Sequence, residues 1–240
     1  LLRLQEEEEL SMRITEEPLQ ELARLLNLSS PPQRIEGYDI SHLRGGEPVG
    51  AMVVFQHGEP LKEEYRRFNV RQAPAGDDCA ALQELLGRRA SQESWPEPDL
   101  ILLDGGKGQL NSVSETLRST VMAGVPLVAL AKNPDHLFLE GSSQPVPLSA
   151  DNAMLYLLQR IRDEGHRFAV SGHRLRRNRN SIHSLLEDIP GVGPARRKAL
   201  LGHFGSAKKL KQASIEQLLK IPGINSSLAT TIHHSLRGEQ

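Results

Sequence analysis

The sequence predicts an α/β domain built on a mixed sheet, followed by a small all-α domain. Three observations support this fold class. Strand-like segments in the first third of the chain are separated by tight turns, which is typical of an antiparallel meander. Short apolar runs in the middle alternate with helical patterns, which favours parallel strands joined by crossovers. Near the end, the pattern of helix, Pro-Gly turn and helix occurs twice.

The first expected elements are a helix and three strands. Residues 1–28 have helical periodicity, which stops at the breaker Ser29-Ser30-Pro31-Pro32. Gly- and Pro-containing turns at 45–48 and 57–60 separate the segments that follow. The strands are expected over residues 34–42, 49–55 and 62–70.

The middle of the chain is expected to form a parallel α/β unit. The run Leu100-Ile-Leu-Leu103 is apolar without interruption, which predicts a strand buried on both faces, because a half-exposed strand would alternate. It ends in Asp104 and two glycines, at the sheet edge where open α/β folds usually hold ligands. The other expected elements are a helix from Asp77 to before Trp95, a helix over 108–121, a strand over 125–132, a hairpin-like stretch over 136–148 and a long helix opening near Asp151.

Composition and charge narrow the class of protein. No apolar run approaches the ~18 residues that span a membrane, and no charged-then-apolar leader is present, so no membrane partner is expected. The single cysteine, Cys79, excludes internal disulfides and a thiolate zinc cluster, which fits the cytoplasm. From Arg160 onward basic residues outnumber acidic ones. This excess indicates a polyanionic partner, although a solvated charged surface would have the same composition.

The repeated segment predicts two phosphate-binding hairpins. Its copies are Ile189-Pro-Gly-Val-Gly193 and Ile221-Pro-Gly-Ile-Asn225, each followed by a helix. The glycine turn leaves the first N–H groups of that helix exposed, which suits a phosphate. Each copy resembles the helix-hairpin-helix motif, and the pair resembles the unit that grips the DNA backbone. Asn225 replaces a glycine, so the second contact is expected to be weaker. The alternative is a helical bundle for protein contacts. The expected DNA contacts here are Gly191, Gly193, Gly223, Lys198, Lys208 and Lys209.

Asp39 and Asp104 are candidate metal ligands. A meander followed by parallel strands resembles the ribonuclease H-like architecture, in which acidic residues on the first and fourth strands lie side by side. Neighbouring carboxylates repel unless a proton or a cation lies between them, and hard oxygen ligands suit Mg²⁺ or Mn²⁺. Such an ion polarises a phosphodiester and lowers the pKa of a bound water.

The long helix is expected to supply a third group. Asp163 and His166 are three residues apart and share a helix face. An imidazole there can bind a metal or act as a general base. Each candidate also has an ordinary alternative, because aspartates often cap helices and helical histidines are often core or surface residues.

Several segments resemble the C-terminal half of the UvrC family, the C subunit of excinuclease ABC. They are Gly37-Tyr-Asp-Ile-Ser-His42, Tyr65-Arg-Arg-Phe-Asn69, Leu102-Leu-Asp-Gly-Gly-Lys-Gly-Gln109, Gln159-Arg-Ile-Arg-Asp-Glu-Gly-His-Arg-Phe168 and Asp188-Ile-Pro-Gly-Val-Gly193. The resemblance implies a ribonuclease H-like fold, tandem helix-hairpin-helix motifs and the 5′ incision of nucleotide excision repair on duplex DNA with a bulky lesion. It also implies catalytic roles for Asp39, Asp104 and His166, and UvrB as a partner, with UvrA acting upstream.

The chain departs from the family in three respects, one of which is that the UvrB-binding segment is not recognised in it, except that the Glu-rich first helix could be the end of that segment. Gly165 stands where the family more often has alanine, which loosens the helix by roughly 1 kcal/mol. The GIY-YIG domain that makes the 3′ cut in the family is not in this sequence, so one incision is expected. Gly105-Gly-Lys107-Gly-Gln lacks the spacing and hydroxyl of a nucleotide-binding loop, and a DNA-phosphate contact is expected for Lys107 instead. Arg66, Arg67 and Arg162 are further candidates, with surface ion pairs as the alternative.

The sequence therefore predicts a DNA endonuclease that depends on Mg²⁺ or Mn²⁺. Asp39 and Asp104 are the expected ligands, and His166 is a ligand, a base or the holder of the attacking water. One alternative is a non-catalytic DNA-binding or assembly module of a repair complex, and another is a structure-selective nuclease with no role in lesion repair. The expected domains are an N-terminal helical segment (1–31), the ribonuclease H-like endonuclease (32–173), a basic linker (174–184) and the tandem helix-hairpin-helix domain (185–240).

Overall fold

The computed structural model describes residues 16–42, 48–132, 134–149, 151–187 and 189–237, and only the backbone of 172–184. The chain divides into two compact units, Leu1–Val170 and Ser171–Gln240, and each is described by itself. The boundaries of the four expected domains stay predictions.

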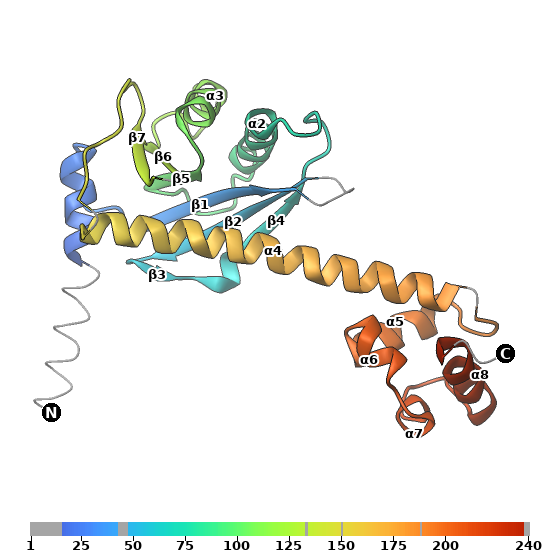
Figure 1. Ribbon diagram of the computed structural model, residues 1–240. Helices are drawn as coiled ribbons and strands as arrows, with labels where there is room; N and C mark the ends of the chain where they lie inside the picture. Colours follow the sequence, from blue (N-terminus) through green and yellow to red (C-terminus); the bar gives the residue numbers. More distant parts are fainter. Residues whose placement is uncertain (1–15, 43–47, 133, 150, 188, 238–240) are drawn as a thin grey trace, which may run out of the picture. The chain divides into compact units, whose positions relative to one another are not determined.

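A mixed seven-stranded sheet forms the centre of the first unit (Figure 1). Its strand order is β3-β2-β1-β5-β6-β7, and β4 also pairs with β2. β1 is antiparallel to β2 and parallel to β5, β5 is parallel to β6, and β6 is antiparallel to β7. This arrangement confirms the predicted fold class. The strands are β1 (Arg34–Ser41), β2 (Val49–Gln56), β3 (Glu59–Pro60), β4 (Arg66–Asn69), β5 (Leu100–Asp104), β6 (Leu127–Ala131) and β7 (His136–Leu139).

The third predicted strand is wrong in detail. The segment begins with a 3-10 turn, η1 (Lys62–Glu64), and only β4 pairs with β2. Glu59 and Pro60, which we expected in a turn, form the short β3 against the end of β2. Lysine and glutamate have low strand propensity, and all three η1 residues reach solvent, so nothing holds this stretch extended.

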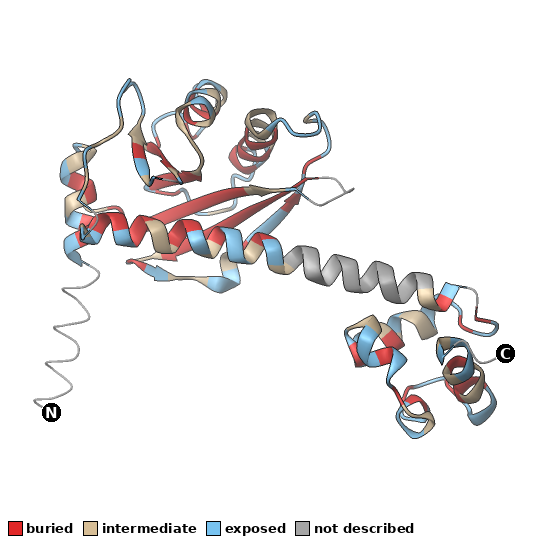
Figure 2. Cartoon of the chain, in the orientation of Figure 1, coloured by how far each residue is buried: buried red, intermediate tan, exposed pale blue. Residues whose placement is uncertain are grey.

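Helices cover both faces of the sheet. α2 (Asp78–Ala90) and α3 (Lys107–Leu117) lie on one face and α4 (Ala153–Glu187) crosses the other (Figures 1 and 2). This double cover explains why β5 and β6 are uninterrupted apolar runs, and it confirms the predicted burial of β5. Residues 16–25 form a further helix whose Leu19 and Leu22 join the same core, whereas residues 1–15 of the predicted N-terminal helix lie outside the described residues.

α4 is longer than a conventional helix of a small domain. Asn152 caps its start by accepting a hydrogen bond from the Leu155 N–H, and the helix continues to Glu187. Residues 174–184, the expected linker, are therefore helical throughout. They contain neither glycine nor proline, so no residue in that stretch ends the helix.

The close approach of β1 to α4 depends on a glycine. A Cβ at Gly37 would lie 2.5 Å from Ile161 Cγ2 and 3.0 Å from Val53 Cγ2, where no side chain fits without movement. Gly37 faces α4 together with Asp39, two residues further along β1, since alternate strand residues share a face. Because Gly37 has no side chain, α4 can pack closely against β1 beside the Asp39 carboxylate.

Gly37→Ala is expected to destabilise the first unit by about 1–3 kcal/mol, because the added methyl group overpacks the contact between β1 and α4. Urea denaturation measures this change. The matched control is Gly87→Ala in α2, where the new Cβ would have its nearest neighbour at 4.0 Å and helix propensity should raise stability by about 0.5–1 kcal/mol. Equal stability of the two variants would contradict the steric argument.

The second unit is a small helical bundle with its own core. Its helices are α5 (Pro194–Phe204), α6 (Ala207–Lys211), α7 (Ile215–Leu219) and α8 (Ser226–Arg237). Leucines and isoleucines from every helix fill the interior, including Leu186, Leu200, Leu210, Leu218 and Ile232. The two predicted helix-turn-helix copies are confirmed, one leading into α5 and the other joining α7 to α8.

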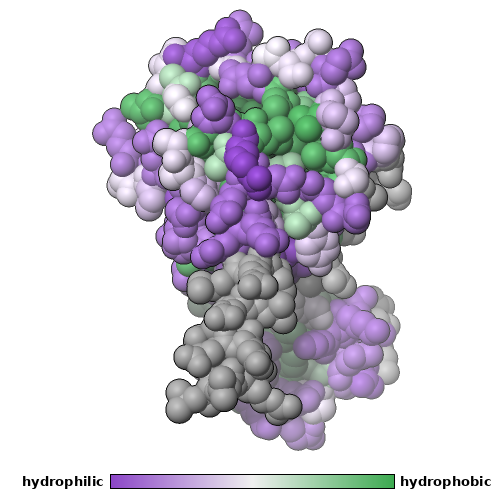
Figure 3. Space-filling model, turned by 90° about the vertical axis from the view of Figure 1, so that its left-hand side faces the viewer, coloured by the Kyte–Doolittle hydropathy of each residue, from purple (hydrophilic) through white to green (hydrophobic). Residues whose placement is uncertain are grey.

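Within the described ranges, no helix combines the length and the apolar character that crossing a membrane requires. Hydrophobic side chains nevertheless gather on one face of the first unit, among hydrophilic ones (Figure 3).

Candidate functional site

Three predicted residues from three separate elements meet at one edge of the sheet. Asp39 lies on β1, Asp104 ends β5 and His166 lies on α4. Tyr38 pairs with Leu103 in the parallel register, so the residues that follow them are neighbours. One ligand atom from each of the three side chains lies within 4.8 Å of the other two. The backbone topology thus forms a compact cluster from residues that are distant in the sequence.

The cluster has the chemistry that a divalent cation requires. Asp39 is only 5% exposed, and among the described residues its Oδ2 has no hydrogen-bond partner. His166 Nδ1 lies 3.6 Å from this oxygen, beyond hydrogen-bonding distance. A buried carboxylate oxygen without a partner is costly. Two carboxylates and an imidazole therefore fit an oxygen-preferring cation such as Mg²⁺ or Mn²⁺.

The electrostatics of the cluster disfavour an ionised Asp39. Burial, and secondly repulsion by Asp104, raise the pKa of Asp39 from 3.8 to about 6, although the positive charges of His166 and Lys132 act in the opposite direction. A cation would remove this conflict, because it attracts both carboxylates.

Asp39→Asn is expected to stabilise the metal-free protein at pH 7.5. The pKa of Asp39 is higher in the folded protein than in the unfolded chain, so protonation of Asp39 stabilises the fold. This contribution to the free energy of unfolding is fully present below about pH 4 and is lost as the pH rises through about 6. The amide of asparagine is neutral at every pH, so the variant should be more stable than wild type at pH 7.5 by roughly 1–3 kcal/mol. Thermal melting from pH 4 to pH 8 measures the difference, which should vanish near pH 4. A variant less stable than wild type at pH 7.5 would contradict the electrostatic argument.

Lys132, which was not among the residues predicted for the site, also belongs to this cluster. It follows β6, and its Nζ lies 3.1 Å from Asp104 Oδ2. The carboxyl ends of neighbouring parallel strands meet at one edge of a sheet. The position of Lys132 directly after the strand that follows Asp104 in the chain could therefore have predicted that the two side chains meet. The lysine holds one oxygen of the Asp104 carboxylate.

Arg162 is buried and is not available to a phosphate. It is 8% exposed, and its guanidinium forms ion pairs with Asp135 and Asp163. Gln159 also donates a hydrogen bond to Asp135, at 2.7 Å. These contacts fix α4 against the connection between β6 and β7, one helical turn before His166. The Arg162 side chain therefore supports α4 and is not proposed as a DNA contact.

The other predicted phosphate contacts of the first unit remain accessible. Lys107 begins α3, and its Nζ donates to the Ser143 carbonyl at 3.4 Å. Arg66 lies over the Trp95 ring, 5.3 Å from its centroid. Arg67 stacks on Phe168 at 3.7 Å and donates to its carbonyl at 2.9 Å. This stacking places Arg67 beside the helical turn that carries His166.

Gly165, the departure from the family pattern, does not interrupt α4. A Cβ at that position would lie 3.7 Å from Asp39 Cβ, an ordinary contact distance. An alanine would therefore fit beside Asp39.

The two hairpins of the second unit use the same turn. The Val192 N–H donates to the Ile189 carbonyl and the Ile224 N–H donates to the Ile221 carbonyl, both at 3.1 Å. With proline at the second position and φ of +84° at Gly191 and +83° at Gly223 in the third, these are type II turns.

The helices after these turns begin differently. Gly193 precedes α5 and has no side chain to cap it. Asn225 caps α8, because its Oδ1 accepts a hydrogen bond from the Leu228 N–H at 2.9 Å. The left-handed backbone conformation of the second turn lies at Gly223 and not at Asn225. A weaker phosphate contact at the second hairpin stays a prediction. Its physical reason is that the Leu228 N–H already donates to the Asn225 side chain and is not free for a phosphate.

The predicted lysines of the second unit are all at the surface. Lys198 lies on α5, and Lys208 and Lys209 lie on α6, all exposed.

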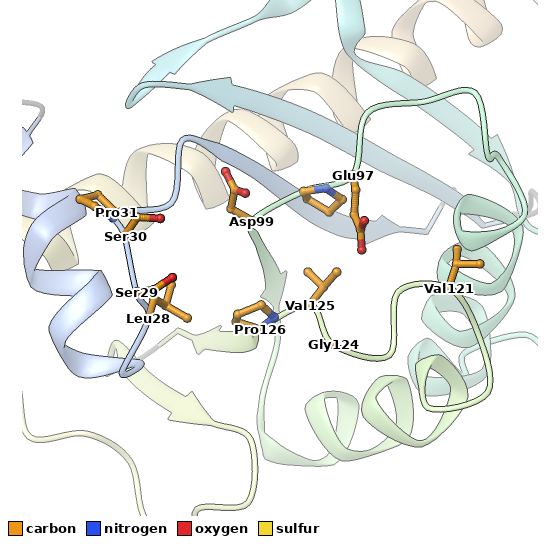
Figure 4. Close-up of a pocket in the computed structure, with 11 residues that line it drawn as sticks. Leu28, Ser29, Ser30, Pro31, Glu97, Asp99, Val121, Gly124, Val125 and Pro126 are labelled. Atoms are coloured by element: carbon orange, nitrogen blue, oxygen red, sulfur yellow. The ribbon is translucent and has the colours of Figure 1, made fainter.

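A separate hollow of about 480 Å³ lies at the opposite edge of the sheet, at the amino ends of β5 and β6 (Figure 4). Its acidic residues are Glu97 and Asp99. Asp99 Oδ2 accepts hydrogen bonds from the backbone N–H groups of Gln33 and Arg34, so this carboxylate holds the start of β1. The apolar part of the lining is Leu28, Pro31, Pro98, Val121, Val125 and Pro126.

Comparison with known proteins decides the family. The model of the UvrC RNAse H endonuclease domain matches residues 23–170, and that of the SAM-like helix-hairpin-helix tandem matches residues 184–237. The chain belongs to the UvrC family. Curated relatives named UvrABC system protein C, from Dehalococcoides mccartyi and Pseudomonas aeruginosa, are each 46% identical over 91% of this chain. A third, from Gloeobacter violaceus, is 46% identical over 95% of the chain. The chain spans 37% of the length of these UvrC relatives.

Solved structures of proteins named endonuclease V also align with this UvrC-family chain. Endonuclease V from Bacillus subtilis is 18% identical, with a TM-score of 0.32, over 54% of this chain and 70% of that one. Human endonuclease V is 23% identical, with a TM-score of 0.28, over 42% of this chain and 46% of that one.

Proposed function

We propose that this chain is a divalent-metal-dependent endodeoxyribonuclease that makes the 5′ incision of nucleotide excision repair beside a bulky lesion. The observation that carries the proposal is the convergence of Asp39, Asp104 and His166 within 4.8 Å at one sheet edge. Membership of the UvrC family supports an incision reaction, and the buried Asp39 Oδ2, which has no hydrogen-bond partner among the described residues, supports a cation there.

Asp39 and Asp104 would hold Mg²⁺ or Mn²⁺ through carboxylate oxygens, with His166 completing the site. When bound, the ion polarises the phosphodiester and lowers the pKa of a water. Lys132 orients Asp104 through one carboxylate oxygen. His166 Nδ1 faces Asp39, and its side chain is 55% exposed, so the imidazole is accessible for binding or for proton exchange with the substrate side.

The second unit would supply much of the grip on DNA. The exposed first N–H groups of α5, following the Gly191 turn and Gly193, suit a backbone phosphate. The second turn at Gly223 would bind more weakly. Lys198, Lys208 and Lys209 would add salt-dependent phosphate contacts. In the first unit, Lys107, Arg66 and Arg67 are the candidate phosphate contacts. By family membership we propose UvrB as the protein partner, with UvrA acting earlier.

An incision assay on a lesion-containing duplex tests the proposal. To isolate the 5′ cut, the substrate carries a nick 3′ of the lesion, and UvrA and UvrB are supplied. We expect a single 5′ cut that requires Mg²⁺ or Mn²⁺ and stops with a chelator. Binding of the same duplex without any cut in either metal would overturn the nuclease assignment and favour the non-catalytic assembly module.

A further inference from the structure

A single arginine joins the two hairpin turns of the second unit. Arg196 lies in the first turn of α5, where its Nη1 donates to the Gly191 carbonyl at 2.6 Å and its Nε donates to the Gly223 carbonyl at 2.7 Å. The two acceptors belong to different copies of the repeat. Because a guanidinium is a rigid planar fork, two such bonds fix the position of one turn relative to the other.

The contact of Arg196 with Gly223 is one half of a reciprocal contact between the two copies of the hairpin. Arg196 and Leu228 occupy the same place, the third residue of the helix that follows each turn. Leu228 Cδ1 lies 3.1 Å from where a Cβ on Gly191 would be, and Arg196 Nε lies 3.7 Å from where a Cβ on Gly223 would be. Each third residue therefore covers the glycine of the other hairpin. One side of this contact is apolar and buried, and the other side is made of hydrogen bonds.

The position of the charge matters for binding an anion. The carbonyl oxygens of Gly191 and Gly223 carry partial negative charge at the turns whose following N–H groups would face a phosphate in the proposed DNA complex. The guanidinium covers both oxygens with a positive group, which removes a local repulsion against phosphate. A lysine in its place would keep the charge, but its ammonium group has no planar fork to bridge the two carbonyls in fixed geometry.

We propose that Arg196 is a positioning residue that holds the two hairpins at the spacing at which both bind the backbone of one DNA duplex. This inference rests on the proposed DNA binding of the second unit. It assigns the coupling between the hairpins to one side chain, whereas the phosphate contacts themselves come from the backbone N–H groups of each hairpin.

Duplex binding at several salt concentrations tests the proposal in the full chain. The variants are Arg196→Lys and Arg196→Met, with Lys198→Met as the matched loss of one exposed cation on the same helix. Both Arg196 variants should bind about tenfold more weakly or worse. In a plot of log binding constant against log salt concentration, the slope for both variants should be shallower than the wild-type slope by more than ~0.9, the contribution of one phosphate contact. Wild-type affinity in Arg196→Lys, or a change in slope no larger than that of Lys198→Met, would overturn the proposal.

Amide hydrogen exchange of the DNA-free chain gives an independent readout. The Val192 and Ile224 N–H groups close the two turns, and both should exchange faster in Arg196→Lys while the middle of α5 and of α8 stays protected. If both amides exchanged at the wild-type rate in Arg196→Lys, the claim that Arg196 holds the two turns together would be contradicted. Failure of the unaltered chain to bind duplex DNA would instead overturn the proposed function, so the two failures are distinguishable.

Discussion

Asp104→Asn should abolish incision while leaving the affinity for duplex DNA nearly unchanged. Asparagine keeps the shape of the side chain, but its neutral amide oxygen binds a divalent cation more weakly than a carboxylate does and lacks the charge that pairs with Lys132. Losing several kcal/mol of stabilisation of the reacting phosphate lowers the rate by about 10³-fold or more. Single-turnover cleavage of the nicked lesion duplex measures this loss, and a parallel binding titration measures the affinity.

The control for this substitution removes the same charge elsewhere in the first unit. Glu97 is exposed at the opposite edge of the sheet, so Glu97→Gln should cut at the wild-type rate. If Asp104→Asn retained a cleavage rate within tenfold of wild type, Asp104 would have no place in the reaction.

Glu36→Ala should have the largest effect on stability, a loss of about 3–5 kcal/mol. Glu36 is fully buried on β1, where it accepts hydrogen bonds from Arg34, Tyr38 and two nitrogens of Arg89. Arg89 is 2% exposed and Arg34 is 6% exposed. Alanine would leave both guanidinium groups buried without their shared counter-ion. Urea denaturation monitored by circular dichroism measures the free energy of unfolding.

A surface ion pair provides the comparison. Glu59 and Arg160 are 3.4 Å apart, with the Glu59 side chain largely in solvent. Glu59→Ala should therefore change stability by less than about 1 kcal/mol. If Glu36→Ala cost no more than Glu59→Ala, the buried network would not hold β1 to α2.

The fold was predictable where burial leaves a pattern in the sequence. The uninterrupted run at 100–103 identified β5 because helices cover both of its faces. The segment from Lys62 to Val70 was mispredicted because its alternation was weak and a local turn competed with the strand. The helical course of 174–184 was missed because polar composition alone resembles a linker.

The candidate site was predictable from the order of its elements, whereas its supporting contacts were not. Asp39 and Asp104 lie on strands whose neighbourhood follows from the topology, and the family pattern pointed to His166; the structure brings these three side chains together. The burial of Arg162 could not be read from the sequence, because it depends on Asp135, which comes from a separate connection. Arg196 bonds to backbone carbonyls, and any residue supplies a carbonyl, so no sequence signal marks its partners.

A crystal of this chain soaked in Mn²⁺ and measured for anomalous scattering tests the proposed metal centre most directly. We expect one anomalous peak bonded to a carboxylate oxygen of Asp39, a carboxylate oxygen of Asp104 and a nitrogen of His166, at about 2.0–2.3 Å from each. The peak should be absent from Asp39→Ala crystals soaked in the same way. Manganese bound elsewhere, with none at these three side chains, would contradict the assignment of this cluster as the nuclease centre.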